Sequence, residues 1–291
     1  MAKARALDKR RKSIKNIRKI TRTMELVSTA QFRPAMLRAN AADSYAKRIV
    51  QLVSDLAQTG LKTEHPLLAK RETKKRAVLF ILTANRGMCG GYNSSVLRVA
   101  LAKLRELQSE YEQVDLFVSG KRGISFLKYR KIEIERSYTE FDHKPSYDRV
   151  LELANELLTL YKKGDIDRFD VAYVKFFSTA KQTPVVETLL PLSNLEAEAN
   201  GNNEKKLDYE FLPSPQSILE EVIPNAFRTL LFKRLLDAAV SEQVARMMAM
   251  KAATDNADEM ISSLTTSYNR ARQSQITNEI IEVISGASAL K

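Results

Sequence analysis

Both ends of the chain show the hydrophobic spacing of long helices. Near the start, apolar residues recur in steps of three and four, at Ile14, Ile17, Ile20, Met24 and Val27. This spacing is typical of the seam along which one long helix packs against another. We therefore predict a helix from about Lys3 to about Gln58. Because a proline inside a helix costs about 3 kcal/mol or bends it, we expect a possible kink near Pro34.

The same spacing returns from about Ser217 to the end of the chain. Apolar or small residues lie there at Val240, Val244, Met247, Ala257, Ile261, Leu264, Tyr268 and Ala271. At about 1.5 Å per residue, the residues after Pro224 would span roughly 90 Å, which is too long to bury within one small domain. Since the N-terminal helix is the only other helix of such length, we predict that the two pair as an antiparallel coiled coil.

The middle of the chain alternates between strands and helices. An uninterrupted apolar run at 77–83 is typical of a buried parallel strand. Further strands are predicted at 114–118, 170–178 and 185–192, with helices at 94–112 and from Pro145 to about 163, and an exposed loop at 196–206. The predicted fold is a Rossmann-like α/β domain (75–210) inserted between two coiled-coil helices (1–60 and 215–291).

Charge is concentrated at the N-terminal end. The chain of 291 residues has a formal net charge of +12, and residues 1–50 alone hold 14 Lys or Arg against three Asp or Glu. Such an asymmetric field indicates an acidic partner, which would be a nucleic acid, an anionic membrane surface or an acidic protein face. No apolar run approaches the roughly 18 residues of a membrane span, and the charged start is not that of a secretory signal.

Catalytic chemistry finds little support in the sequence. The segment Gly87–Gly91 fits neither common phosphate-loop pattern, so we interpret it as a tight turn between a strand and a helix. Cys89 is the only cysteine, which excludes an internal disulfide and paired thiolate ligands, and we interpret it as a packed thiol. His65 and His143 are interpreted as ordinary surface residues. We therefore predict neither a catalytic site nor a cofactor or metal.

Two further hypotheses come from other classes of protein. A coiled-coil nucleic-acid adaptor would use the basic N-terminal helix, although that stretch has only Phe32 and Tyr45 as aromatics for base stacking. Its affinity for nucleic acid would fall steeply with salt. A small α/β enzyme would instead depend on Cys89.

Several motifs, in order along the chain, resemble the gamma subunit of F-type ATP synthases. They are the segments 17–27 (IRKITRTMELV), 86–93 (RGMCGGYN, where the family has RGLCGGYN), 245–256 (ARMMAMKAATDN), 268–273 (YNRARQ) and 276–287 (ITNEIIEVISGA). Asn85 stands where the family usually has aspartate. The resemblance covers essentially the whole chain.

The resemblance implies a central rotor stalk that couples rotation of the membrane c-ring to conformational change at the catalytic sites of the beta subunits, without catalysing a reaction itself. It implies contacts with beta-subunit loops through Met24, Arg246, Arg272, Gln273, Thr277 and Glu279. An apolar tip, Ile280, Ile281, Val283 and Ile284, would turn in a hydrophobic sleeve, because a helix that is apolar on several faces is buried.

The same resemblance implies the partners and the location. The head would be built of alpha and beta subunits, and the α/β foot would bind the epsilon subunit and the c-ring, without nucleic acid. The absence of a transit peptide favours a bacterial complex, with the chain peripheral to the plasma (inner) membrane on its cytoplasmic side. The single cysteine argues against the thiol-switched insert of chloroplast relatives.

Overall fold

The computed structural model describes residues 2–58, 66–68, 71, 74–142, 144–192 and 215–289. The chain divides into two compact units, one of Met1–Thr29 with Arg246–Lys291 and the other of Ala30–Ala245. Helices α1 (Ala2–Gln58) and α6 (Pro215–Ala289) each contribute to both units. Helix α1 continues through Pro34, so the proline does not end it.

A five-stranded mixed sheet forms the centre of the larger unit. Its order is β3-β2-β1-β4-β5; the first four strands are parallel and β5 runs antiparallel to β4. The strands are β1 (Arg76–Leu82), β2 (Gln113–Ser119), β3 (Arg136–Tyr138), β4 (Arg168–Phe176) and β5 (Gln182–Leu190). The order of the parallel strands confirms the predicted Rossmann-like domain between two long helices.

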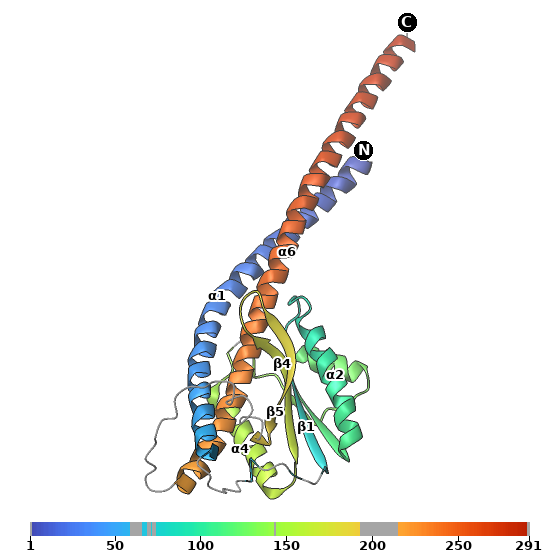
Figure 1. The fold of residues 1–291 in the computed structure, drawn as a ribbon. Helices are drawn as coiled ribbons and strands as arrows, with labels where there is room; N and C mark the ends of the chain where they lie inside the picture. The colour runs from blue at the N-terminus through green and yellow to red at the C-terminus, as the bar shows by residue number, and fades with distance from the viewer. Residues whose placement is uncertain are drawn as a thin grey trace. The chain divides into compact units, whose positions relative to one another are not determined.

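Helices cover both faces of this sheet (Figure 1). Because side chains alternate along a strand, Leu79 and Ile81 of β1 pack beneath α2 (Tyr92–Glu110) and α3 (Lys121–Tyr129), while Val78 and Phe80 face the opposite side. That opposite side is covered by α4 (Tyr147–Lys163) and by the parts of α1 and α6 that belong to this unit. The predicted long strands and helices are confirmed, whereas α3 and the short β3 were not predicted.

The two long helices also pack against each other within the larger unit. Ala35 and Ala39 of α1 form a small buried cluster with Leu236 and Val240 of α6. Such short alanine side chains allow close packing between the helices. The predicted loop at 196–206, the predicted boundaries at 60 and 210, and both histidines lie outside the described residues.

Candidate subunit-contact surface

The smaller unit is an antiparallel pair of helices. Arg18 of α1 forms an ion pair with Asp258 of α6. One turn further along α1, Thr21 accepts a 2.9 Å hydrogen bond from Thr254 and in turn donates to the carbonyl oxygen of Arg18. In the other direction, the guanidinium of Arg11 lies 4.9 Å from the ring centroid of Tyr268. Residue numbers rise on one helix as they fall on the other, which confirms the predicted antiparallel arrangement.

The predicted seam on α6 is confirmed. Its residues in this unit are buried or half-buried: Met247, Ala257, Ile261, Leu264, Tyr268 and Ala271. Met250 and Thr254 extend the same row of three- and four-residue steps. This spacing keeps one face of α6 against α1 over seven turns.

The predicted seam on α1 is wrong in part. Ile14 and Met24 are half-buried, but Ile17, Ile20 and Val27 are about half exposed. The face turned to α6 instead includes Ala4, Leu7, Arg11, Ile14, Thr21 and Ser28, which recur in steps of three, four or seven residues. Its last two members are short and polar. Because threonine and serine are short, the helices approach closely there, and the larger apolar side chains are left on the outside.

Basic side chains share the outer face of α1 with these apolar residues. Lys9, Arg10, Lys15 and Lys19 are exposed and have no ion pair within the part of the chain that the structure describes. Asp8 is the local exception, since it pairs with Lys12 and Arg11. The hydrogen bond from Lys12 holds the pKa of the Asp8 carboxyl below its usual value, against an opposing effect of desolvation. The face is therefore both positive and partly apolar.

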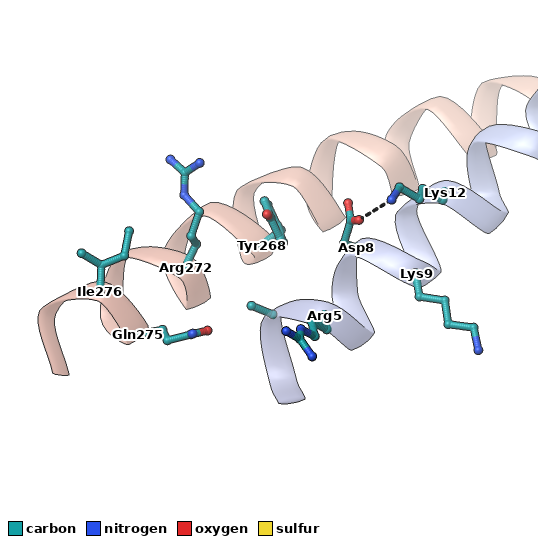
Figure 2. A pocket seen from close by; sticks show the side chains of 9 residues that line it. Arg5, Asp8, Lys9, Lys12, Tyr268, Arg272, Gln275 and Ile276 are labelled. Atoms are coloured by element: carbon teal, nitrogen blue, oxygen red, sulfur yellow. Dashed lines mark ion pairs between the residues drawn. The ribbon is translucent and has the colours of Figure 1, made fainter. Parts of the chain in front are cut away.

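A groove of about 510 Å³ lies between the start of α1 and the later part of α6 (Figure 2). It is lined by Ala4, Arg5, Asp8, Lys9, Lys12, Tyr268, Arg272, Gln275 and Ile276. Four of these side chains are cationic and one is anionic, so the groove is suited to a carboxylate of a partner. Of the predicted subunit-contact residues, the groove contains only Arg272, and Tyr268 of the predicted α6 seam also lines it. The residues from α1 were missed because their pattern of charges gives no sign of their proximity to α6.

The other predicted contact residues are distributed along the same two helices. Gln273, Thr277 and Glu279 are exposed on α6, where Glu279 accepts a 2.8 Å hydrogen bond from Gln275. Met24 is half-buried, and Arg246 is buried, with 6% of its surface exposed. The predicted tip residues Ile280, Ile281, Val283 and Ile284 are all more than half exposed in the chain alone.

The glycine-rich segment is a strand-to-helix turn, as predicted. Asn93 fixes it, because its side-chain oxygen accepts from the Ala84 N–H at 2.9 Å and its amide donates to Cys89 Sγ at 3.1 Å. Cys89 is buried, as expected of a packed thiol. Asn85 donates to the carbonyl of Thr139 and accepts from the N–H of Lys121, a pairing that requires both ends of an amide.

The carboxyl edge of the parallel strands has almost no free space. Ligands of doubly wound folds bind at this edge, but here Leu235, Ala238 and Ala239 of α6 lie over the ends of β1 and β2, and the cavity that they line is about 10 Å³. Tyr92 secures the helix there by donating a 3.2 Å hydrogen bond to the Ala238 carbonyl. A space of this size holds at most about one water molecule.

Neither a membrane-spanning helix nor a metal-binding cluster is present in the parts of the chain that the structure describes. Within those parts of the chain, no helix combines the length and hydrophobicity that crossing a membrane requires. Nor do three or more His, Cys, Asp or Glu side chains come together there in a way that could hold a metal ion.

Comparison with known proteins connects this arrangement to one family. The family model described as ATP synthase matches residues 3–290. The ATP synthase gamma chains of Rhodopirellula baltica and Leptospira biflexa are 54% and 40% identical to this chain, each over 100% of both chains. A chain in the Euglena gracilis mitochondrial ATP synthase (OSCP/F1/c-ring) has the same fold, with a TM-score of 0.69, 17% identity and coverage of 99% of this chain and 95% of that one.

These findings place the chain among the subunits of ATP synthases. A second chain, from the rotor of the Euglena gracilis enzyme, gives a TM-score of 0.64 at 19% identity, over 94% of this chain and 99% of that one. On the full-length identities, the chain belongs to the gamma chain family of ATP synthases. The nucleic-acid adaptor hypothesis finds no support among these relatives.

Proposed function

We propose that this chain is the central rotor shaft of a proton-translocating F-type ATP synthase and catalyses no reaction itself. The filled carboxyl edge of the sheet supports the second part, because the place where this fold class holds a nucleotide is occupied by Leu235, Ala238 and Ala239. The full-length identity to gamma chains supports the first.

The observation that carries the proposal is the exposed apolar end of α6. In the smaller unit α6 continues past the start of α1 (Figure 1), and the isoleucines and valine of this end are between 46% and 72% exposed: Ile276, Ile280, Ile281, Val283 and Ile284. Exposed apolar surface of this extent marks a contact with another protein. A helix end that is apolar on several sides suits a sleeve in which it can turn.

The contact residues are proposed from the resemblance to gamma chains, since in the chain alone Met24 is half-buried and Arg246 is buried. We propose that Met24, Arg246, Arg272, Gln273, Thr277 and Glu279 meet loops of the beta subunits, and that Ile280, Ile281, Val283 and Ile284 form the bearing. The basic groove beside Arg272 would accept a carboxylate from such a loop. The exposed Lys9, Arg10, Lys15 and Lys19 would favour acidic loops and fix the orientation of the shaft more than its affinity.

We propose that the shaft acts through the difference between its faces. The outer face of α1 is basic and apolar, whereas the corresponding surface of α6 carries both signs of charge, as at the exposed Lys251 and Asp255. Three equivalent beta subunits around such a shaft would each contact a different face. Since a shaft can bias a site only through contacts that differ between its states, each site would hold a different nucleotide affinity, and rotation would exchange them.

The remaining partners belong to the same proposal. The α/β foot, within residues 75–210, would bind the epsilon subunit and the c-ring, while the coiled-coil segments, within 1–60 and 215–291, would enter a head of alpha and beta subunits. The chain would then be peripheral to the plasma membrane on its cytoplasmic side.

The test is to co-express the chain with the alpha and beta subunits of its own organism and to measure ATPase activity of the purified assembly. We expect a stable complex whose activity depends on the chain, and weaker coupling when residues 273–291 are deleted. Failure of the full-length chain to co-purify with the ring would contradict the shaft assignment.

A further inference from the structure

A second groove lies on the outer side of the sheet's helical layer. It runs between α2 and α3, has a volume of about 630 Å³ and belongs entirely to the larger unit. Its floor is apolar and is formed by Leu97, Leu101 and Phe126. Its rim is basic and consists of Arg98, Arg105, Arg122 and Arg130.

Helical spacing explains why these residues converge. Leu97 and Leu101 are four residues apart on α2, so they lie on one face of that helix. Arg122 and Phe126 of α3 and Arg130, the C-cap residue of that helix, follow at intervals of four and form a matching stripe. The groove is therefore formed by two helix faces and does not depend on a loop.

The charge of the groove is not compensated within the described residues. None of the four arginines has an ion pair there, and no carboxylate lines the groove. Elsewhere on the same domain basic side chains are paired, as Lys103 is with Glu106 and Arg136 with Glu156. Four guanidinium groups around one apolar floor repel one another, so an anionic occupant lowers the electrostatic energy.

Two of the rim arginines, Arg122 and Arg130, are held in place by neighbouring residues. A methyl group added at Gly87 would lie 2.9 Å from Nη2 of Arg122, so this guanidinium rests directly on the glycine-rich turn. Arg130 stacks on Phe126, with 5.0 Å between its guanidinium carbon and the ring centroid. Because arginine pairs with carboxylates through two parallel hydrogen bonds, arginines held in this way favour aspartate or glutamate in fixed positions.

We propose that this groove is the docking site of an acidic amphipathic helix that belongs to another subunit of the complex. Along α2 the lining residues extend from Asn93 to Arg105, or roughly 18 Å, which is long for a small molecule and matches about three turns of helix. The occupant would place apolar residues at i, i+3 and i+4 on the floor and carboxylates at the rim. A small ligand would remain largely exposed between the exposed arginines, whereas small-molecule sites bury about 70–90% of their ligand.

The inference rests on the proposed function, and one experiment distinguishes the two. A photo-reactive amino acid, p-benzoylphenylalanine, is placed at Ala102, an exposed residue in the middle of the groove. The control position is Lys163, exposed at the end of α4 on the other side of the sheet. The assembled complex is purified through a tag on the alpha subunit, irradiated, and its cross-linked peptides are identified by mass spectrometry.

We expect cross-links from position 102 to one segment of another subunit, rich in Asp and Glu and with helical apolar spacing, and no cross-link to that segment from position 163. The double variant Arg98→Glu, Arg105→Glu should reduce its yield at least about tenfold, because both substitutions put like charges opposite the occupant. Lys163→Glu should leave the yield unchanged.

Other outcomes overturn the proposal. They are cross-links to lipid, to residues 193–214 of this chain or to a segment without acidic excess, an assembled complex without any cross-link from position 102, and a yield that the double variant does not change. If the wild-type chain does not assemble with the ring, the proposed function fails and the docking site fails with it. An assembled complex without the cross-link leaves the shaft assignment intact.

Discussion

Arg234 of α6 lies 2.6 Å, nitrogen to oxygen, from Glu187 of β5 in the interior of the larger unit. Glu187 also accepts a 2.9 Å hydrogen bond from Lys175 on β4, and the guanidinium of Arg234 lies 5.8 Å from the ring centroid of Tyr173. Only 10% of the Arg234 side chain and 18% of the Glu187 side chain are exposed. This ion pair therefore joins the long C-terminal helix to the edge of the sheet.

Glu187→Gln should destabilise the larger unit by about 2 kcal/mol, because it leaves Arg234 and Lys175 without their partially buried counter-charge. Chemical denaturation followed by circular dichroism measures the change. The control is Glu152→Gln, whose partner Arg149 is exposed, as Glu152 itself is; it should cost less than about 0.5 kcal/mol. Equal effects of the two substitutions would show that the buried pair contributes no more than a surface pair.

The same carboxylate predicts a dependence on pH. Burial raises the pKa of Glu187, but the charge of Arg234 and the hydrogen bond from Lys175 outweigh it, so the folded-state pKa lies below the ordinary value of 4.5. The unfolded chain then binds more protons, and the contribution of Glu187 is full above that value and lost as pH falls through the folded pKa. The difference in melting temperature between wild type and Glu187→Gln should therefore shrink below about pH 4.5. A constant difference would contradict this assignment.

Gly120→Ala should destabilise the sheet by more than about 3 kcal/mol. Gly120 has φ of +100°, and an added Cβ would lie 2.1 Å from the backbone oxygen of Thr83. That oxygen cannot move freely, because it belongs to the segment directly after β1. Gly91→Ala is the matched control, since its Cβ would come no nearer than 3.9 Å to another atom, Ser94 Oγ. Thermal unfolding of both variants compares them directly, and similar melting temperatures would count against the steric argument.

The elements that the sequence predicted well share one property: their apolar residues are buried against other parts of the same chain. The apolar run of β1 is buried on both faces, and the α6 row from Val240 to Ala271 packs on α1, so pattern and structure agree. Helix α3 has only Gly123 and Leu127 buried, and β3 has three residues, so neither is long enough to produce a period.

The α1 seam was predicted wrongly for a different reason. Ile17 and Ile20 repeat at helical spacing, yet the side facing α6 is built around Thr21 and Ser28. The spacing of apolar residues shows that a helix has an apolar stripe. It does not show whether the same chain or another protein covers that stripe. In α1 the short polar residues contact α6, and the apolar stripe is left exposed. This arrangement is expected of a helix that also binds a partner outside the chain.

The outer face of α1 predicts an effect on assembly. Replacing the unpaired Lys15 and Lys19 by glutamate should slow association of the chain with a ring of alpha and beta subunits by about tenfold at low ionic strength, and less at high salt. Stopped-flow fluorescence of a labelled chain measures the rate. The double variant Lys121→Glu, Lys128→Glu, at two exposed positions of α3 in the foot, is the control with the same change in net charge. A slower rate that is independent of salt would exclude electrostatic steering as the cause.

The hydrogen bond between Thr254 and Thr21 should couple the two helices of the smaller unit by about 0.5–1 kcal/mol. Valine keeps the branched shape of threonine, so Thr21→Val, Thr254→Val and the double variant form a thermodynamic cycle. Each hydroxyl retains a second partner, the carbonyl of Arg18 for Thr21 and that of Met250 for Thr254, so neither single substitution leaves a buried hydroxyl unpaired. Native-state hydrogen exchange of α6 amides around Thr254 reports this unit separately from the sheet. If the two single effects simply add, the helices are held by their apolar contacts, and the register of the shaft does not depend on this hydrogen bond.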